Sequence, residues 1–385
     1  MQQTALQADR VSDHWSRRLE DSSSDFSAET YWLANPEVRR RHVLHQTQGR
    51  REDSWVNDVV EHFLGDSIPV ERILSIGCGA GQLERHLAEL GAFNECDAWD
   101  VATGAIETAR RLAGEQGLHH IHYSVCDANA VELPPERYDA VLFHSSLHHI
   151  AALESVCENV ARGLKPGGWL FINEYVGPNV FDFTPRQKEV IRAAFDLIPR
   201  RFRRSGHLDW AVAEAASIPS PAEVAAADPS EAVRSAEILD VVSHYFDVVE
   251  INPAGGTVLQ FLLHGIAGNF RPEAPDSVEV LDLLIQIEET LIDVGDLRSD
   301  FAVVTARRKD TPAPPRPAAV PILVEAGVDA LAAAGTRLPT TEEIRLNAEI
   351  ERLTAKLQTM ESTKIWRAGH LYWAALRRLR SWLGS

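Results

Sequence analysis

Short apolar runs alternate with amphipathic segments between residues 71 and 175. The runs that predict buried strands lie at residues 73–76, 97–100, 121–125, 138–143 and 169–172. After the first run, residues 82–90 place Leu83, Leu87 and Leu90 on one helical face. Strands that alternate with helices in this way predict a parallel sheet with right-handed crossovers. The pattern therefore indicates an α/β fold.

The alternation stops after residue 178. Residues 179–230 combine a basic helix, expected over 186–204, with a loop and a run of small residues. An insertion directly after the fifth strand lies near the carboxyl ends of the strands, where loops carry specificity, so we interpret it as a substrate lid. Beyond it, the pattern predicts helices over 231–246, 258–270 and 277–294, and strands over 247–252 and 298–307.

A glycine-rich turn joins the first strand to the first helix. Gly77, Gly79 and Gly81 allow positive φ and let the backbone approach a ligand closely, beside the free N–H groups of a helix N-terminus. Asp100 ends the second strand about twenty residues later, where an acid can bind ribose hydroxyls. Such a turn predicts a nucleotide-like cofactor. Asp100 has a second interpretation as the N-cap of the following helix.

These landmarks resemble those of the class I S-adenosylmethionine-dependent methyltransferases. The resemblance rests on the glycine turn, Asp100, Asp127-Ala128, Leu147-His148-His149 and Lys165-Pro166-Gly167-Gly168. It implies a Rossmann-like, seven-stranded methyltransferase sheet whose last strand runs antiparallel, with S-adenosylmethionine as cofactor. The glycine spacing departs from the dinucleotide pattern because position 82 is Gln, so a nicotinamide dinucleotide is the minor alternative.

The resemblance also implies which residues bind the cofactor. The backbone of the three glycines would hold it, with Asp100 on the ribose, Asp127 and Ala128 on the adenine edge, and His144 near the methionine part. The expected cofactor-binding residues are Gly77, Gly79, Gly81, Asp100, Val101, Asp127, Ala128 and His144.

A hydroxyl acceptor needs a base, whereas an amine acceptor needs only to be neutral and aligned. The candidate catalytic residues are His148 and Glu174, at the ends of strands four and five, and His207 in the lid. A His at the place of His148 is also often structural in the resembling family. We expect no metal site.

Composition narrows the class of protein further. A net charge of -18 argues against a general nucleic-acid binder, which needs to neutralise phosphates. The four cysteines are scattered, as expected for reduced thiols in a cytoplasm. The chain shows neither a secretory signal nor an apolar stretch of membrane-spanning length, so we expect a cytoplasmic enzyme.

The predicted organisation has four parts: an arm and cap helices at 1–54, the methyltransferase domain at 55–309, a Pro-rich linker at 310–339 and a helical tail at 340–385. The tail combines a short coiled-coil seam with a basic, aromatic amphipathic segment. It is loosely similar to tails of bacterial enzymes of cell-surface polysaccharide assembly. We expect it to bind the inner face of the membrane, a protein partner or a second copy of the chain.

The sequence thus predicts methyl transfer from S-adenosylmethionine, with a saccharide hydroxyl in a glycan or its precursor as the acceptor. Two alternatives stay open. One is a small-molecule N- or C-methyltransferase. The other is a non-catalytic scaffold that keeps the methyltransferase fold.

Overall fold

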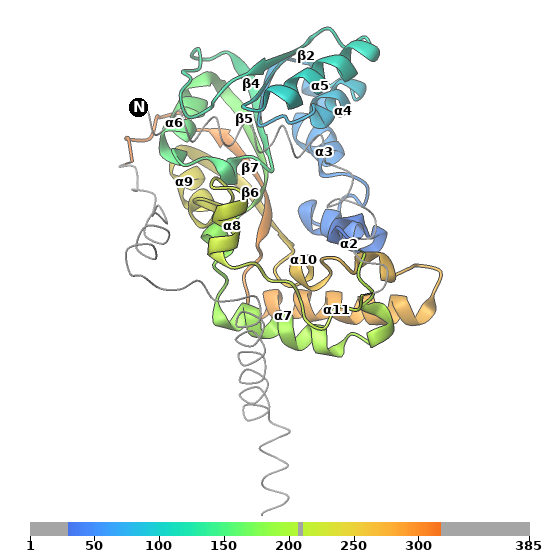
Figure 1. The fold of residues 1–385 in the computed structure, drawn as a ribbon. Coiled ribbons are helices and arrows are strands. Elements are labelled where there is room, and N and C mark those ends of the chain that lie inside the picture. The colour runs from blue at the N-terminus through green and yellow to red at the C-terminus, as the bar shows by residue number, and fades with distance from the viewer. Residues whose placement is uncertain (1–29, 207–210, 317–385) are drawn as a thin grey trace, which may run out of the picture. The chain divides into compact units, whose positions relative to one another are not determined.

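Seven strands form one sheet in the order β3-β2-β1-β4-β5-β7-β6 (Figure 1). The strands are β1 (Val70–Ile76), β2 (Phe93–Asp100), β3 (Ile121–Val125), β4 (Tyr138–His144), β5 (Leu164–Tyr175), β6 (Phe246–Gly255) and β7 (Phe301–Arg308). Strands β1 to β5 pair in parallel, and β7 runs antiparallel to both β5 and β6. This arrangement confirms the predicted seven-stranded, Rossmann-like sheet with its antiparallel last strand.

The structure is a computed structural model, and it describes residues 30–206 and 211–316. All of these residues belong to one unit, Met1–Pro321, while a second unit, Ile322–Ser385, lies outside the described part. The predicted N-terminal arm and C-terminal tail therefore stay predictions. No helix within the described ranges is both long and apolar enough to cross a membrane.

Helices cover both faces of the sheet, because its parallel strands are apolar on both faces (Figure 1). The helices α3 (Trp55–Asp58), α4 (Gln82–Glu89) and α5 (Thr103–Glu115) lie on one side, and α6 (Leu153–Gly163) and α9 (Ile238–Tyr245) on the other. Ile73 packs with the first group and Leu74 with the second, and both are nearly inaccessible to solvent. A parallel strand that is buried on both faces in this way has a continuous apolar sequence instead of an alternating one.

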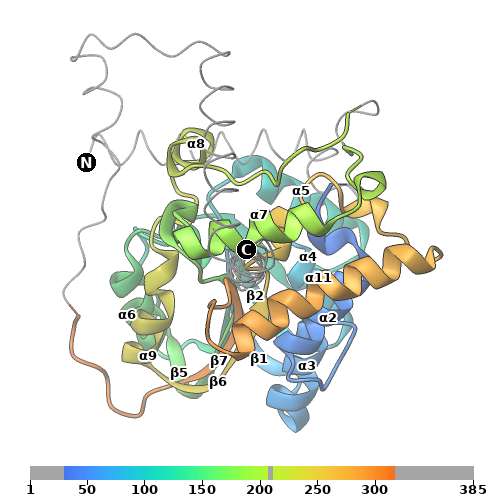
Figure 2. The ribbon, with the colours of Figure 1, turned by 90° about the horizontal axis from the view of Figure 1, so that it is seen from below.

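A third apolar cluster lies at one end of the sheet. It joins α7 (Pro185–Leu197), α10 (Leu259–Leu262) and α11 (Pro275–Asp293) to the short N-terminal turn at Trp32. Figure 2 shows α7 and α11 crossing this end of the molecule. Much of the predicted lid thus packs into its own core, and its role over the substrate stays a prediction.

Three predicted helices are shorter in the structure than the periodicity indicated. The helix expected over 186–204 ends at Leu197, because Pro199 cannot continue it. The one expected over 258–270 is only α10, since the chain turns at Gly265 with a φ of 73°. Local turn chemistry overrides apolar spacing in both cases.

The helix expected over 231–246 begins only at Ile238, after a 3-10 turn at Ser235–Glu237. The reason is Arg234, which is 2% exposed and forms ion pairs with Glu154 and Glu237. Because this guanidinium is buried, residues 231–234 form a turn instead of continuing the helix. The turn places Glu231 beside the end of β4.

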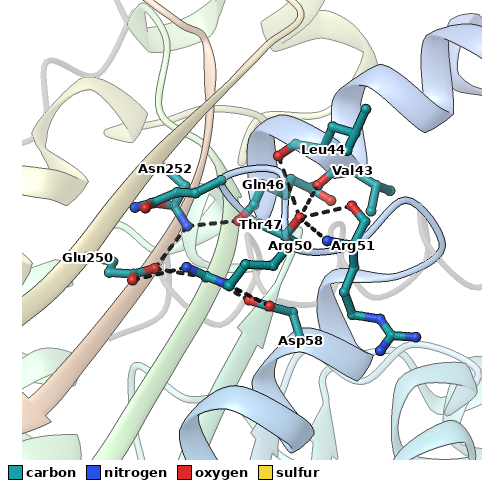
Figure 3. Close-up of polar contacts among 10 residues, drawn as sticks. Val43, Leu44, Gln46, Thr47, Arg50, Arg51, Asp58, Glu250 and Asn252 are labelled. Carbon is teal, nitrogen blue, oxygen red and sulfur yellow. Dashed lines mark hydrogen bonds and ion pairs between the residues drawn. The ribbon is translucent and has the colours of Figure 1, made fainter.

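Helix α2 (Pro36–Gln46) and the loop after it are fastened to β6 by a polar cluster (Figure 3). Arg50 donates to both oxygens of Asp58, at 2.8 and 2.7 Å, and to both oxygens of Glu250, at 3.2 and 3.0 Å. Asn252 donates to the carbonyl of Gln46 at 2.8 Å. One guanidinium therefore joins the N-terminal segment, α3 and the sheet.

Replacing Arg50 with Ala should lower the free energy of unfolding by about 2–4 kcal/mol, because Asp58 is 4% exposed and would lose its charged partner. Urea denaturation measures this. Arg51→Ala is the matched control, since Arg51 pairs with the more exposed Asp53 and Glu61 and should cost at most about 1 kcal/mol. Equal losses in the two variants would show that Arg50 is not the fastening residue.

Candidate functional site

The glycine turn is tied to the end of β2 by backbone hydrogen bonds. Gly77 and Cys78 both donate to the carbonyl of Trp99, at 2.7 and 2.9 Å. The three glycines of the turn have φ values of 76°, 51° and 75°, which L-residues with a side chain rarely adopt. The predicted turn is thus present, and hydrogen bonds hold it against the end of β2.

The surroundings of the turn explain its glycines. A Cβ at Gly77 would lie 2.2 Å from Ser146 Cβ, and one at Gly81 would lie 2.3 Å from the Tyr123 hydroxyl. A Cβ at Gly79, by contrast, would have no atom within 4 Å. Helix α4 begins directly after Gly81, and no side chain caps it. The turn therefore presents an open face and a helix N-terminus, an arrangement that suits an anionic ligand group.

Asp100 holds this turn in place. Its Oδ2 accepts from the Gly79 N–H at 2.8 Å and its Oδ1 accepts from the Ala102 N–H at 2.8 Å. The N-cap of α5 is Ala102, so the alternative interpretation of Asp100 as that cap is wrong. Burial raises the pKa of Asp100, while these backbone bonds oppose the rise. Each carboxylate oxygen can accept a second hydrogen bond, which leaves capacity for ribose hydroxyls.

Three more of the expected cofactor-binding residues lie on the loops after β2 and β3: Val101, and the pair Asp127 and Ala128 expected at the adenine edge. Val101 and Ala128 are partly buried, and Asp127 Oδ1 accepts from both the backbone and the side-chain nitrogen of Asn129, at 2.9 Å each. Val125, at the end of β3, is 49% exposed although it is apolar. The structure thus brings Val101, Asp127 and Ala128 to the carboxyl ends of neighbouring strands. Their contacts with a cofactor stay predictions.

His144 is the last residue of β4. Its ring is accessible to solvent and lies 5.4 Å from the ring of Trp55, between centroids. The protein around it still desolvates the imidazole, and this lowers its pKa. The next residue, Ser145, has a φ of 51° and donates its N–H to the carbonyl of Asn173 at 2.9 Å. Strain of this kind in a residue with a side chain often marks a functional turn.

His148 and Glu174 are brought together, and both are buried. Glu174 Oε1 accepts from the N–H groups of Ser146 and Leu147, at 2.5 and 2.6 Å, and Oε2 lies 2.5 Å from His148 Nδ1. Burial disfavours the charged imidazole, but Glu174 outweighs this and, with weaker effects from Glu231 and Asp228, raises the pKa of His148. Glu174 thus acts as a clamp that holds residues 146–148, the loop after β4, in place. A catalytic role for either residue stays a prediction, and His207 lies outside the described residues.

Four residues that surround His148 and Glu174 were not among the candidate site residues predicted from the sequence. Ser146 donates to the carbonyl of Ile76 at 2.7 Å and so closes the space beside Gly77. His149, Asp228 and Glu231 meet on the far side of His148. His149 stands in the Leu-His-His segment and was visible there. Asp228 and Glu231 carry no local signal, because only the turn at Arg234 brings them to β4.

Glu84, on α4 behind the glycine turn, titrates near neutrality. Burial raises its pKa to about 7, from an ordinary value of 4.5. The unfolded chain therefore ionises this group before the folded protein does, so the stability it contributes is complete below pH 4.5 and is lost as the pH rises toward 7. The full loss is roughly 3 kcal/mol.

Glu84→Gln removes this titration. The free energy of unfolding of the variant relative to the wild type should rise between about pH 4.5 and pH 7 and then stay constant. Denaturant unfolding at several pH values measures it. The exposed Glu107→Gln provides the control. A difference that does not change with pH would contradict the assignment.

Comparison with known proteins agrees with this geometry. Residues 74–172 match the methyltransferase domain family. The chain is similar to ubiquinone biosynthesis O-methyltransferases from Burkholderia pseudomallei strain 1710b (31% identity over 147 residues) and from Chelativorans sp. strain BNC1 (34% over 150 residues). Each match covers 38% of this chain and 58% or 57% of the relative, so the chain spans little more than half the length of these relatives.

Among solved structures, geranyl diphosphate methyltransferase in complex with GPP and sinefungin superposes with a TM-score of 0.43 at 15% identity. This superposition covers 78% of this chain and 99% of that one.

The sheet order, the glycine turn clasped by Asp100 and the family match over residues 74–172 together define the class of protein. The chain carries a class I S-adenosylmethionine-dependent methyltransferase domain. The cofactor of this class is S-adenosylmethionine, and the open, uncapped turn fits its charged methionine part.

Proposed function

We propose that the protein transfers the methyl group of S-adenosylmethionine to a hydroxyl oxygen of its acceptor. The observation that carries the proposal is the Asp100–Gly79 hydrogen bond, which holds a glycine turn open toward the strand ends. A carboxylate that both shapes the turn and keeps acceptor capacity suits a nucleoside ligand better than a packing role alone.

Each part of the site has its own role in this proposal. The backbone from Gly77 to Gly81 binds the cofactor, and Asp100 orients it. Bound S-adenosylmethionine would supply an electrophilic methyl carbon with an excellent leaving group, so the protein mainly has to align the acceptor. His144 offers an accessible, neutral imidazole at the end of β4, where it is suited to accept the hydroxyl proton.

For the acceptor we propose a saccharide hydroxyl. The loose likeness of the C-terminal tail and the insertion at 179–230 support it. The names of the relatives point instead to an oxygen acceptor in ubiquinone biosynthesis. Both acceptors are hydroxyl compounds, which favours O-methylation over the N- or C-methyltransferase alternative.

The test is incubation of the purified full-length protein with methyl-labelled S-adenosylmethionine and separate pools of glycolipids, soluble saccharides, phenolic quinone precursors and amines. Label in a saccharide ether supports the proposal in full. Label in a phenolic ether keeps O-methylation and refutes the saccharide. Label only in amines or on carbon refutes both, and cofactor binding without turnover in any pool favours the scaffold.

We also propose a cytoplasmic location, with the tail at 340–385 attaching the protein to the inner membrane face, a partner or a second copy of the chain. The scattered cysteines support the first part, since all four are free thiols. The basic and aromatic composition of the tail supports the second.

A further inference from the structure

Three side chains with metal-binding atoms meet behind the end of β4. His148 and His149 belong to the short turn Leu147–His149, and Glu231 follows the insertion. One ligand atom from each of the three lies within 4.8 Å of the others. His148 Nε2 is 3.5 Å from Glu231 Oε1, and the centroids of the two imidazole rings are 4.1 Å apart. Two imidazoles and a carboxylate form a donor set typical of transition metals.

Neighbouring groups fix both imidazoles through their Nδ1 atoms. Glu174 Oε2 lies 2.5 Å from His148 Nδ1, which directs Nε2 of that ring toward Glu231. Ser230 Oγ lies 3.1 Å from His149 Nδ1 and itself donates to Asp228 Oδ1 at 2.7 Å. A carboxylate behind a histidine, directly or through a hydroxyl, is the usual support of a metal-binding imidazole.

Asp228 supplies a second, independent observation. The residue is 3% exposed, and its Oδ2 has no hydrogen-bond partner among the described residues. This oxygen lies 3.7 Å from His149 Nδ1. A buried carboxylate oxygen without a hydrogen bond is costly unless a cation compensates it. Because this oxygen lies on the Nδ1 side of His149, Asp228 supports the ring from behind, and a metal ion on Nε2 would strengthen the attraction between the imidazole and this carboxylate.

The charges around the cluster also favour a cation. Glu174 lies 2.5 Å from His148 Nδ1, Glu231 lies 3.5 Å from His148 Nε2, and Asp228 lies 3.7 Å from His149 Nδ1, so three carboxylates surround the two imidazoles. The nearby Arg234 does not neutralise them, because it is engaged by Glu154 and Glu237. A divalent ion would balance this excess of negative charge.

We propose that His148, His149 and Glu231 bind one divalent transition-metal ion of the Zn²⁺ type, with Glu174 and Asp228 as supporting carboxylates. This departs from the expectation of a metal-free site. The proposal does not depend on the identity of the acceptor or on methyl transfer itself. The alternative is a metal-free network in which a protonated His148 forms the ion pair with Glu174.

The test uses Co²⁺ as a spectroscopic substitute and Zn²⁺ competition, on the full-length protein treated with a chelator and dialysed. We expect one equivalent of Co²⁺ with visible d–d bands and no thiolate charge-transfer band. Asp228→Asn should weaken affinity about 10–100-fold, as loss of a supporting partner does. Glu231→Gln should weaken it more than Asp228→Asn, because it removes a ligand. Glu273→Gln, an exposed carboxylate elsewhere, is the matched control and should bind as the wild type does.

Thermal unfolding by circular dichroism and S-adenosylhomocysteine binding show whether each variant is folded. A folded Glu231→Gln variant with wild-type Co²⁺ affinity would overturn the proposal. So would a wild-type protein that binds no Co²⁺ at about millimolar concentration, or one whose bands report cysteine ligands. These outcomes are independent of whether methyl transfer is observed.

Discussion

Replacing Asp100 with Ala should weaken the binding of S-adenosylmethionine at least about 100-fold, or about 2.8 kcal/mol. The reason is that this carboxylate serves two purposes. It accepts from Gly79 and Ala102 and so shapes the turn, and it is the acceptor proposed for the ribose. Hydrogen bonds to charged groups contribute about 1.5–3 kcal/mol each. The loss of two or more of them in Asp100→Ala is therefore enough to account for a change of about 2.8 kcal/mol in binding free energy. Isothermal titration calorimetry with S-adenosylhomocysteine measures the loss.

Asp139→Ala is the matched control for this prediction. Asp139 also accepts from a backbone N–H, that of Arg72 at 2.8 Å, but it lies at the opposite end of β4. We expect Asp139→Ala to lower the free energy of unfolding and to leave the affinity for the cofactor unchanged. If both variants bound S-adenosylhomocysteine as the wild type does, Asp100 would be a purely structural residue.

The sequence was sufficient to predict the sheet and the turn, because both depend on local patterns. Apolar runs such as 73–76 follow from burial on both faces, and Gly77 and Gly81 follow from the lack of room for a Cβ. The order of the last two strands came from the family resemblance. No periodicity in residues 246–308 distinguishes an inserted antiparallel strand from an added parallel one.

The rest of the site depends on contacts between distant parts of the chain. Glu231 lies in a segment whose spacing predicted a helix, and only the burial of Arg234 against Glu154 turns it toward His148. Asp228 likewise meets His149 across about eighty residues of sequence. Such pairs cannot be derived from one sequence, since their spacing carries no period.

The contacts of Glu174 likewise could not be derived from the sequence. From its position at the end of β5, the sequence could assign it to the acceptor or to the orientation of a base. The structure shows that its oxygens accept from Ser146, Leu147 and His148. Its side chain is fully buried, so an acceptor could touch it only if this loop opened. The stability of the loop and the chemistry of the site are therefore coupled through one carboxylate.

Glu174→Ala should consequently lower the free energy of unfolding by about 3–5 kcal/mol, because it leaves the buried N–H of Leu147, the partly buried N–H of Ser146 and the His148 imidazole without their partner. The melting temperature should fall by roughly 6 °C or more. Differential scanning calorimetry measures both. Glu174→Gln should cost less, since its carbonyl oxygen can still accept from Ser146 and Leu147 while its amide faces His148.

Glu115→Ala removes an exposed ion pair with Arg111 and controls for the loss of a glutamate, with an expected cost of at most about 1 kcal/mol. The informative comparison is between stability and turnover. A Glu174→Ala protein that melts with the wild type but has lost turnover would make Glu174 a catalytic group. A protein that loses stability, and recovers turnover at low temperature where the loop is folded, would make it the clamp that positions the end of β4.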